Sequence, residues 1–194
     1  MSVPRWLPNA ISVLRVLLVP AWVLLAEAAN LGYELNRAER GDELRLWAAL
    51  VLVAIGLSDV LDGWLARRFD LRSKLGATLD AVADKLAQVV LTTWLALRAA
   101  PAFPEIPLWF LLLLIARDGL LLVGYVVIKR RHGAVHTEHE LHGKASSLCL
   151  FGLLLAFSFA APPAVTTPWL VVSTAIVLWS TAAYVRRGVA ELRR

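Results

Sequence analysis

Apolar residues dominate six stretches of this chain, and each is close to the length that crosses a bilayer as a helix. A helix needs about 20 mostly apolar residues to span the hydrocarbon core. Turn-rich or charged segments separate the stretches, beginning with Ala26–Gly32 and the mixed-charge residues that follow it. The pattern predicts an all-α polytopic membrane protein with six transmembrane helices, at roughly 10–28, 46–66, 79–99, 107–128, 145–161 and 169–185.

Composition leads to the same class independently. The chain has 194 residues, of which 59% are hydrophobic, and its mean hydropathy is +0.66. These values are too apolar for an ordinary soluble domain of this length, so we expect residues 1–194 to form a single membrane domain. The one cysteine, Cys149, excludes an intrachain disulfide and is expected to be a packing residue.

The net charge of +5 raises the question of nucleic acid, but the positions of the basic residues argue against it. Most of the 20 lysines and arginines lie near those span ends that share one side if the N-terminus is inside. The positive-inside rule then places both termini in the cytoplasm, and with them the site described below. We therefore expect an integral protein of the cell inner or plasma membrane, with membrane lipids as partners and no nucleic acid.

The N-terminus imitates a signal peptide, with Arg5, an apolar run and the triplet Ala26-Glu27-Ala28. Arg15 interrupts the apolar run, and five further spans follow it. The segment is therefore expected to remain as the first membrane helix.

Four aspartates stand among residues that otherwise belong to two lipid-soluble helices. Asp59 and Asp62 are spaced i, i+3, and Asp80 and Asp84 are spaced i, i+4, so each pair projects from one face of its helix. Ionisable groups at membrane depth are costly and usually mark a functional cavity. Carboxylate oxygens suit hard divalent cations, and a pair of metals clamping a phosphoryl group would use four acids. We therefore expect Mg²⁺ or Mn²⁺, with two ions bound.

Small residues and one arginine accompany the aspartates. Gly63 follows Asp62, and Gly76 lies one turn before Asp80. Glycine within a helix costs about 1 kcal/mol relative to alanine, so both positions suggest the close approach of a ligand to the backbone. Ala66 keeps the same face shallow, and Arg67 supplies a forked cation suited to phosphate oxygens.

The motif Asp59-x2-Asp62-Gly63-x2-Ala66-Arg67-x8-Gly76-x3-Asp80-x3-Asp84 resembles the signature of the CDP-alcohol phosphotransferase family at every fixed position and spacing. Members of that family are integral membrane enzymes that displace CMP from a CDP-linked lipid or alcohol by the hydroxyl of a second alcohol. The resemblance implies a homodimer, metal binding by the aspartates and Asp84 as general base, with Asp84 also a candidate metal ligand. It also implies a CDP site formed by Asp59, Asp62, Gly63, Ala66, Arg67, Gly76 and Asp80.

The beginning of the chain adds to this resemblance. Pro8-Asn9-Ala10-Ile11-Ser12-Val13-Leu14-Arg15 is similar to a segment of the family's phosphatidyl-transferring branch. By that likeness Asn9, Ser12 and Arg15, at helical spacing, would face the nucleotide or its phosphates. The alternative is a capped helix whose Arg15 snorkels to the interface.

Two further regions concern the acceptor alcohol. Arg117-Asp118 lies within the fourth predicted span, and Gly143-Lys144 precedes the fifth. Arg117 either forms a local ion pair or faces the cavity and binds an anionic phosphate of the acceptor, and the cost of an unpaired arginine at that depth favours the second interpretation. Lys144 is a second candidate contact. Both regions resemble the CMP-forming cardiolipin synthases more than the phosphatidylglycerophosphate synthases.

The sequence departs from the family at two positions, Ala81 in place of a common proline and Leu150 in place of a usual glutamine. Leu150 weakens the choice of acceptor. The histidines form one loop whose spacing suggests either zinc binding or, as the more ordinary interpretation, a solvated juxtamembrane segment. They are His132, His136, His139 and His142.

The predicted reaction is phosphatidyl transfer from CDP-diacylglycerol to the hydroxyl of an anionic glycerol-type acceptor, with release of CMP. Phosphatidylglycerol, giving cardiolipin, is the first choice of acceptor, and glycerol 3-phosphate is the second. Inositol phosphate and serine follow. A membrane cation transporter would also explain the four aspartates, but it gives no reason for Gly63, Ala66, Arg67 and Gly76 at their spacings.

Overall fold

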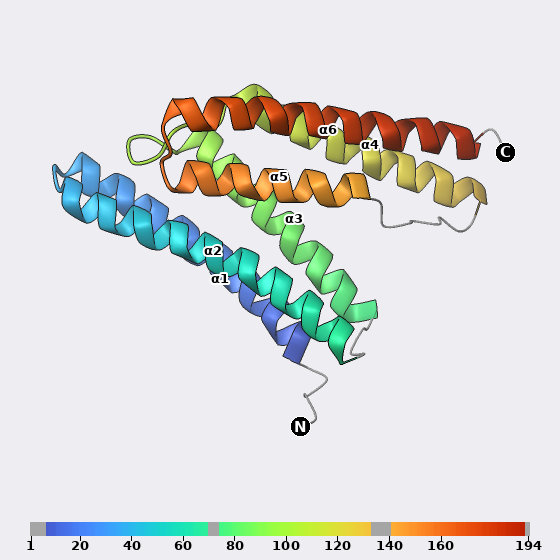
Figure 1. Cartoon of the computed structure of the whole chain (residues 1–194), viewed down its shortest axis with the longest axis horizontal. Helices are drawn as coiled ribbons and strands as arrows, with labels where there is room; N and C mark the ends of the chain where they lie inside the picture. The colour runs from blue at the N-terminus through green and yellow to red at the C-terminus, as the bar shows by residue number, and fades with distance from the viewer. Residues whose placement is uncertain (1–6, 70–73, 133–140, 193–194) are drawn as a thin grey trace. The chain divides into compact units, whose positions relative to one another are not determined.

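The computed structural model describes residues 7–69, 74–132 and 141–192, and over these ranges the chain forms six α-helices and no strand (Figure 1). The centre of each helix coincides with one of the six apolar stretches, so the all-α class is confirmed. The helices are α1 (Leu7–Glu34), α2 (Ala38–Arg68), α3 (Lys74–Leu97), α4 (Leu108–His132), α5 (Leu141–Ser158) and α6 (Pro163–Leu192).

Four of the described helices are long and apolar enough to cross a membrane. Their apolar parts are Ala10–Glu34, Ala38–Leu65, Leu108–Arg130 and Pro163–Ala190. The apolar part of α5, Ala145–Ser158, is shorter. α3 has the length but carries Asp80, Asp84 and Lys85. Length and composition thus support four of the six predicted crossings.

The boundary between α1 and α2 differs from the sequence prediction. Ala26–Gly32 was expected to be turn-rich, yet it is helical, and only residues 35–37 separate the two helices. Asn36 makes this short turn possible with φ of 56°, a left-handed conformation that asparagine tolerates better than most residues. The backbones come close where a side chain on Gly32 would meet the Gly41 amide nitrogen at 2.9 Å. Glycine here therefore permits the close helix packing that a turn-based prediction does not anticipate.

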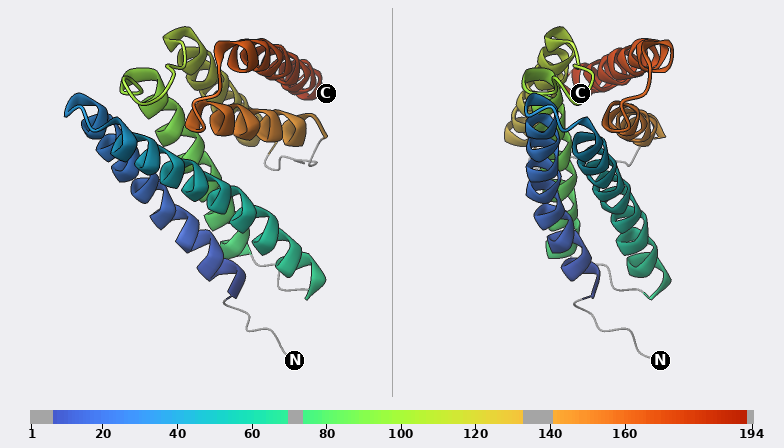
Figure 2. Two further views of the ribbon diagram at one scale, coloured as in Figure 1. Left: turned by 60° about the vertical axis from the view of Figure 1, so that its left-hand side comes forward. Right: turned by 90° about the vertical axis from the view of Figure 1, so that its left-hand side faces the viewer.

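The chain divides into two compact units, residues 1–106 with 154–161, and residues 107–153 with 162–194. In the first unit α1 contacts both α2 and α3 (Figure 2). Its core contains a fully buried Trp22, whose ring lies 5.2 Å from that of Trp94 in an edge-on arrangement. Phe103 completes this aromatic group at 5.3 Å from Trp94. The aromatic rings therefore fix α1 against α3 and the loop that follows it.

Polar contacts next to these rings also fix α1 relative to the end of α3. The buried Asn30 amide donates to the Arg98 carbonyl at 2.7 Å and accepts from the Ala102 amide at 2.9 Å. Glu27 accepts from the Trp94 indole at 2.9 Å and pairs with Arg98 at 2.8 Å. α1 is thus held in one register along α3, which matters for the position of Arg15 further down the same helix.

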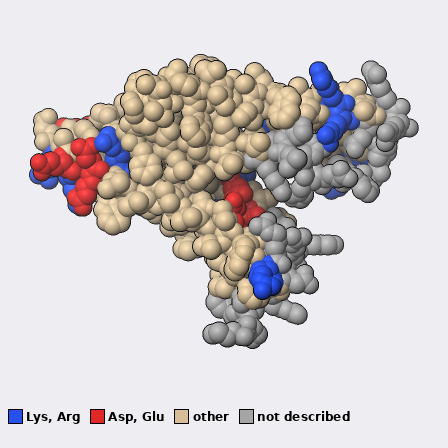
Figure 3. Space-filling model, viewed as in Figure 1, with Lys and Arg blue, Asp and Glu red and all other residues tan. Residues whose placement is uncertain are grey.

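In the second unit, α4 and α6 are in contact, and the first part of α5 packs on α6. The Trp169 indole donates to the Cys149 carbonyl at 3.1 Å, and the Cys149 thiol lies 3.2 Å from the Ser173 hydroxyl. On the face drawn in Figure 3, the described charged side chains gather in a few groups on an otherwise uncharged surface. This distribution is typical of a protein whose helices face lipid.

Candidate active site

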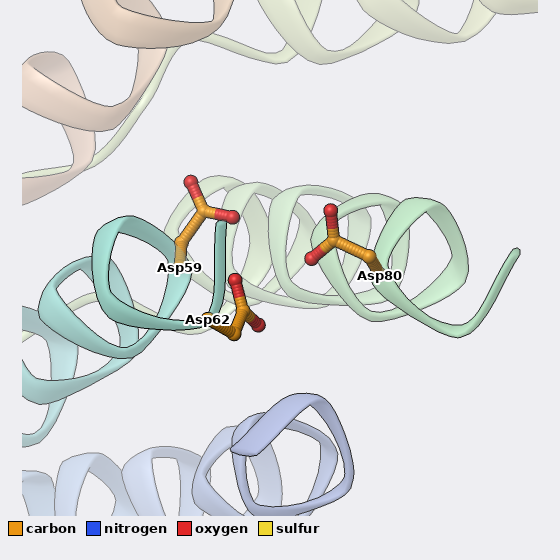
Figure 4. A group of neighbouring side chains, drawn as sticks. All are labelled: Asp59, Asp62 and Asp80. Atoms are coloured by element: carbon orange, nitrogen blue, oxygen red, sulfur yellow. The ribbon is translucent and has the colours of Figure 1, made fainter. Parts of the chain in front are cut away.

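Carboxylates from two helices meet at one place in the first unit. Asp59 and Asp62 come from the last turns of α2, and Asp80 comes from the second turn of α3. Each offers an oxygen, and these oxygens lie within 4.8 Å of one another. Figure 4 shows the three carboxyl groups directed toward a common space. The helical spacings therefore do place the two acidic faces opposite each other.

Arg15 of α1 lies in the middle of this group. Its Nη1 is 3.1 Å from Asp59 and 2.9 Å from Asp80, and its Nη2 is 2.6 Å from Asp62. Nη1 also donates to Asp84, one helical turn after Asp80. The Arg15 side chain has no exposed surface, so it does not snorkel to the interface as one alternative proposed. All four predicted aspartates are thus brought together, with an arginine as their common partner.

The site has a closed side and an open side. The Asp62 side chain is only 5% exposed, whereas those of Asp59, Asp80 and Asp84 are 47%, 41% and 51% exposed. Arg15 lies on the closed side with Asp62. A ligand therefore has access to three carboxylates without entering the helix core.

Two serines complete the closed side. Ser12, one turn before Arg15, donates to Asp62 at 3.1 Å. Ser58 accepts from the Arg15 Nε at 3.3 Å and donates to the Ile55 carbonyl at 2.7 Å. Ser12 was predicted to face the nucleotide, and in this structure it contacts a predicted metal ligand. Ser58 was missed, although its position directly before Asp59 on a membrane helix was an available signal.

The remaining predicted contacts are described only in part. Gly63 and Gly76 are half-buried residues of α2 and α3, next to the aspartate turns. Four predicted site side chains lie outside the described part of the structure, although their backbones are helical: Asn9, Ala66, Arg67 and Lys144. The predicted histidine loop, from His132 to His142, has no described side chains either. The roles assigned to these residues stay predictions.

Arg117 of α4 belongs to the second unit. Its Nη1 lies 3.6 Å from the Asp118 carboxylate, and its side chain is 12% exposed. Its buried Nε has no hydrogen-bond partner among the described residues. The local ion pair is therefore present but leaves part of the guanidinium available, and the acceptor role stays a prediction.

The donor set of the aspartate group fits a divalent metal. Hard cations such as Mg²⁺ and Mn²⁺ prefer carboxylate oxygens, and Mg²⁺ is usually bound by one or two carboxylates together with phosphate oxygens and water. Three or four carboxylates on facing helices, most of them accessible from one side, meet that requirement. The fold and this site together define a helical membrane protein with an acidic, metal-type centre.

The chain belongs to the CDP-alcohol phosphatidyltransferase family, because the model of that family matches residues 5–185. The match covers α1 through most of α6 and includes every aspartate of the site. The family resemblance seen in the aspartate motif is thereby confirmed.

Curated relatives are similar over most of the chain. The CMP-forming cardiolipin synthase of Streptomyces coelicolor is 40% identical over 78% of this chain and 62% of its own length. A putative cardiolipin synthase of Mycobacterium tuberculosis is 31% identical over 77% and 61%. The CDP-diacylglycerol–glycerol-3-phosphate 3-phosphatidyltransferase of Bacillus subtilis is 31% identical over 79% and 83%. The chain thus spans about three fifths of the length of the cardiolipin synthases.

Proposed function

We propose that the protein transfers the phosphatidyl group of CDP-diacylglycerol to the hydroxyl of phosphatidylglycerol, which gives cardiolipin and releases CMP. The observation that carries this proposal is the group of four aspartates from α2 and α3, which lies within the region matched by the family. The names of the Streptomyces and mycobacterial relatives support the choice of acceptor.

In this proposal Asp59, Asp62, Asp80 and Asp84 would hold two Mg²⁺ or Mn²⁺ ions. Such ions would supply Lewis-acid stabilisation of the diphosphate and of the charge that develops on it. The cytidine diphosphate would lie along the site residues Asn9, Ser12, Gly63, Ala66, Arg67 and Gly76.

In the same proposal Asp84 has a second role, as general base. Its side chain is 51% exposed at the open side of the site, which supports access by an acceptor hydroxyl. The acceptor oxygen forms a bond to the β-phosphorus while the bond from that phosphorus to CMP breaks, and the Asp84 carboxylate takes the hydroxyl proton.

An anionic acceptor requires cations outside the aspartate group. Arg117 and Lys144 are the proposed acceptor-phosphate contacts, and the partly unsatisfied guanidinium of Arg117 supports that role. Both contacts suit phosphatidylglycerol and glycerol 3-phosphate alike.

Glycerol 3-phosphate is the second candidate acceptor, and a specific observation favours it. The Pseudomonas fluorescens relative is named CDP-diacylglycerol–glycerol-3-phosphate 3-phosphatidyltransferase, and its match covers 96% of this chain and 92% of its own length. The product would then be phosphatidylglycerophosphate.

The proposal extends to the arrangement in the membrane. Residues 1–194 would form one domain that crosses the cell inner or plasma membrane six times, as a homodimer with both termini and the active site at the cytoplasmic side. A single family model that spans residues 5–185 supports the one-domain arrangement. The basic residues near the span ends support the orientation.

The test is CMP release from CDP-diacylglycerol by purified protein in lipid nanodiscs. Phosphatidylglycerol, glycerol 3-phosphate, inositol 1-phosphate and serine are offered separately, with Mn²⁺, Mg²⁺ or a chelator. We expect metal-dependent CMP release with phosphatidylglycerol, and cardiolipin as the lipid product. Release with glycerol 3-phosphate alone would select the second candidate. A folded protein that releases no CMP with any acceptor would favour the transporter alternative.

A further inference from the structure

Arg15 lies at the place where the proposed function puts the metal ions. Its guanidinium lies among the carboxylates that are proposed to bind the metals, and its nitrogens are 2.6 to 3.1 Å from Asp59, Asp62 and Asp80. These are the separations of direct ion pairs. The guanidinium therefore occupies space between the carboxylates that a divalent cation would also need.

The cationic group of Arg15 is shared by several carboxylates. Among the described contacts, this one guanidinium pairs with all four aspartates. A guanidinium Nη has two protons, yet the Nη1 of Arg15 is shared among Asp59, Asp80 and Asp84. Each of these three carboxylates thus shares Nη1 with the other two. A divalent ion that reached these oxygens would replace a shared contact.

The contacts on the closed side are of another kind. Nη2 contacts Asp62 at 2.6 Å, and Nε contacts Ser58 at 3.3 Å. Asp62 is itself buried and accepts a further hydrogen bond from Ser12. Arg15 therefore forms a separate ion pair with Asp62 on the closed side, through Nη2. On the open side, three carboxylates share its Nη1.

We propose that Arg15 is a displaceable counter-cation, which pairs with the aspartates when no metal is bound and competes with the divalent metals for Asp59, Asp80 and Asp84. The inference rests on the metal site of the proposed function. A metal on the open side repels the guanidinium, because two cations among the same oxygens are unfavourable. The guanidinium then loses its three shared partners, and diphosphate oxygens, which accept the same forked donors, would replace them.

The competition has two consequences that a phosphate-binding role alone does not have. Removing the charge of Arg15 takes away an ion-pair partner that the four carboxylates share, which lowers the stability of the protein without metal. The same change removes the competitor of the metal and strengthens metal binding. A residue that contacts only phosphate would change neither property in the absence of the nucleotide lipid.

The experiment measures Mn²⁺ affinity and thermal stability without CDP-diacylglycerol. Purified wild type and Arg15→Gln in nanodiscs are titrated with Mn²⁺, and free Mn²⁺ is followed by electron paramagnetic resonance. We expect Arg15→Gln to bind Mn²⁺ about tenfold more tightly or better, because a nearby like charge is removed. Its melting temperature in chelator should fall, and the rise caused by Mn²⁺ should exceed that of wild type.

Arg15→Lys covers the case in which the glutamine variant does not fold in chelator. An ammonium is a compact charge and cannot contact all four carboxylates at once. Its Mn²⁺ affinity should therefore lie between those of wild type and Arg15→Gln. Arg40→Gln is the matched control, because Arg40 is an ion-paired arginine of the same unit whose partner is Glu43. Its Mn²⁺ affinity should equal that of wild type.

Unchanged or weaker Mn²⁺ binding by Arg15→Gln, or by Arg15→Lys if the glutamine variant does not fold, would overturn the competition while leaving the metal site intact. Absence of Mn²⁺ binding in wild type and in both variants would overturn the metal part of the proposed function as well. The two failures are therefore distinguishable in one series of titrations.

Discussion

At the scale of single residues, the site contains charged side chains that have little contact with water. Asp62 is 5% exposed and Arg15 is fully buried, so neither can rely on water. Their ion pair, with hydrogen bonds from Ser12 to Asp62 and from Arg15 to Ser58, compensates the lost hydration. The three more exposed aspartates remain accessible to ligands from the open side. Buried charges thus anchor the site, and exposed charges of the same type are available for its chemistry.

Asp84 is the residue at which the base and metal-ligand roles can be separated. Asp84→Asn should slow turnover about 10²- to 10⁴-fold, because the amide cannot take the acceptor proton. The initial rate of CMP release gives the turnover, and the Mn²⁺ titration gives the metal affinity. Retained affinity with lost turnover would identify a base, and lost affinity would identify a ligand.

The control for this prediction is Asp42→Asn. Asp42 is an exposed acid at the other end of α2, where it accepts from Tyr33 and Arg45. The Asp42→Asn substitution makes the same chemical change far from the site along the helix and should leave turnover normal. Near-normal turnover in Asp84→Asn itself would remove Asp84 from the base role.

At the scale of elements, α1 delivers Arg15 to carboxylates that belong to two other helices. Asn30 and Glu27 fix α1 against the end of α3 by hydrogen bonds, and Gly32 allows α2 to lie close beside it. Arg15 is about 22 Å from Asn30 along the helix axis, at 1.5 Å per residue. α1 is continuous over this distance, with Pro20 inside it, and so connects the two positions. Features remote from the site therefore decide where the guanidinium lies.

Gly32→Ala tests the close approach of α1 and α2. An added Cβ would lie 2.9 Å from the Gly41 nitrogen and 3.0 Å from its Cα, and backbone atoms cannot move aside as a flexible side chain does. We expect a destabilisation of about 1–3 kcal/mol, typical of overpacking. A lower melting temperature in nanodiscs would report it.

Gly119→Ala in α4 is the matched control. No described atom outside its own helix backbone lies within 4 Å of the added Cβ. Alanine should therefore leave the melting temperature unchanged or raise it, since glycine within a helix costs up to about 1 kcal/mol. Equal melting temperatures for Gly32→Ala and wild type would mean that the two helices are further apart in the membrane.

At the scale of the whole molecule, the proposed orientation rests on charge distribution and span number. Six crossings would put both ends of the chain on one side, and the turn between α1 and α2 on the other. The nucleotide of the proposed substrate would come from the cytoplasm, so an active site at the ends of α2 and α3 would be useful only if those ends face the cytoplasm. The charge distribution and the proposed chemistry therefore both require these helix ends to face the cytoplasm.

Single cysteines test this orientation in a Cys149→Ser background. Glu39→Cys, in the first turn of α2, should react with a membrane-impermeant maleimide in right-side-out vesicles. Ser2→Cys and Arg194→Cys should react only after the vesicles are opened, because both termini are expected inside. Labelling of one terminus from outside would require an odd number of crossings.

The sequence by itself determined the helices and the acidic residues of the site. Long apolar runs can satisfy their backbone in a bilayer only as helices, so length and composition were sufficient for the six helices. Spacings of three and four residues fix which aspartates share a face, because helix geometry is local. The family followed from the same motif.

Only the tertiary structure decided which cation meets the aspartates and where the first two helices separate. Arg15 and Asp80 are 65 residues apart, and no local pattern encodes a contact over that distance. Ala26–Gly32 is helical, and Gly32 packs closely against Gly41, which is also a contact between different helices. Periodicity describes one helix at a time, whereas the register between helices depends on packing and hydrogen bonds that form only in the folded chain.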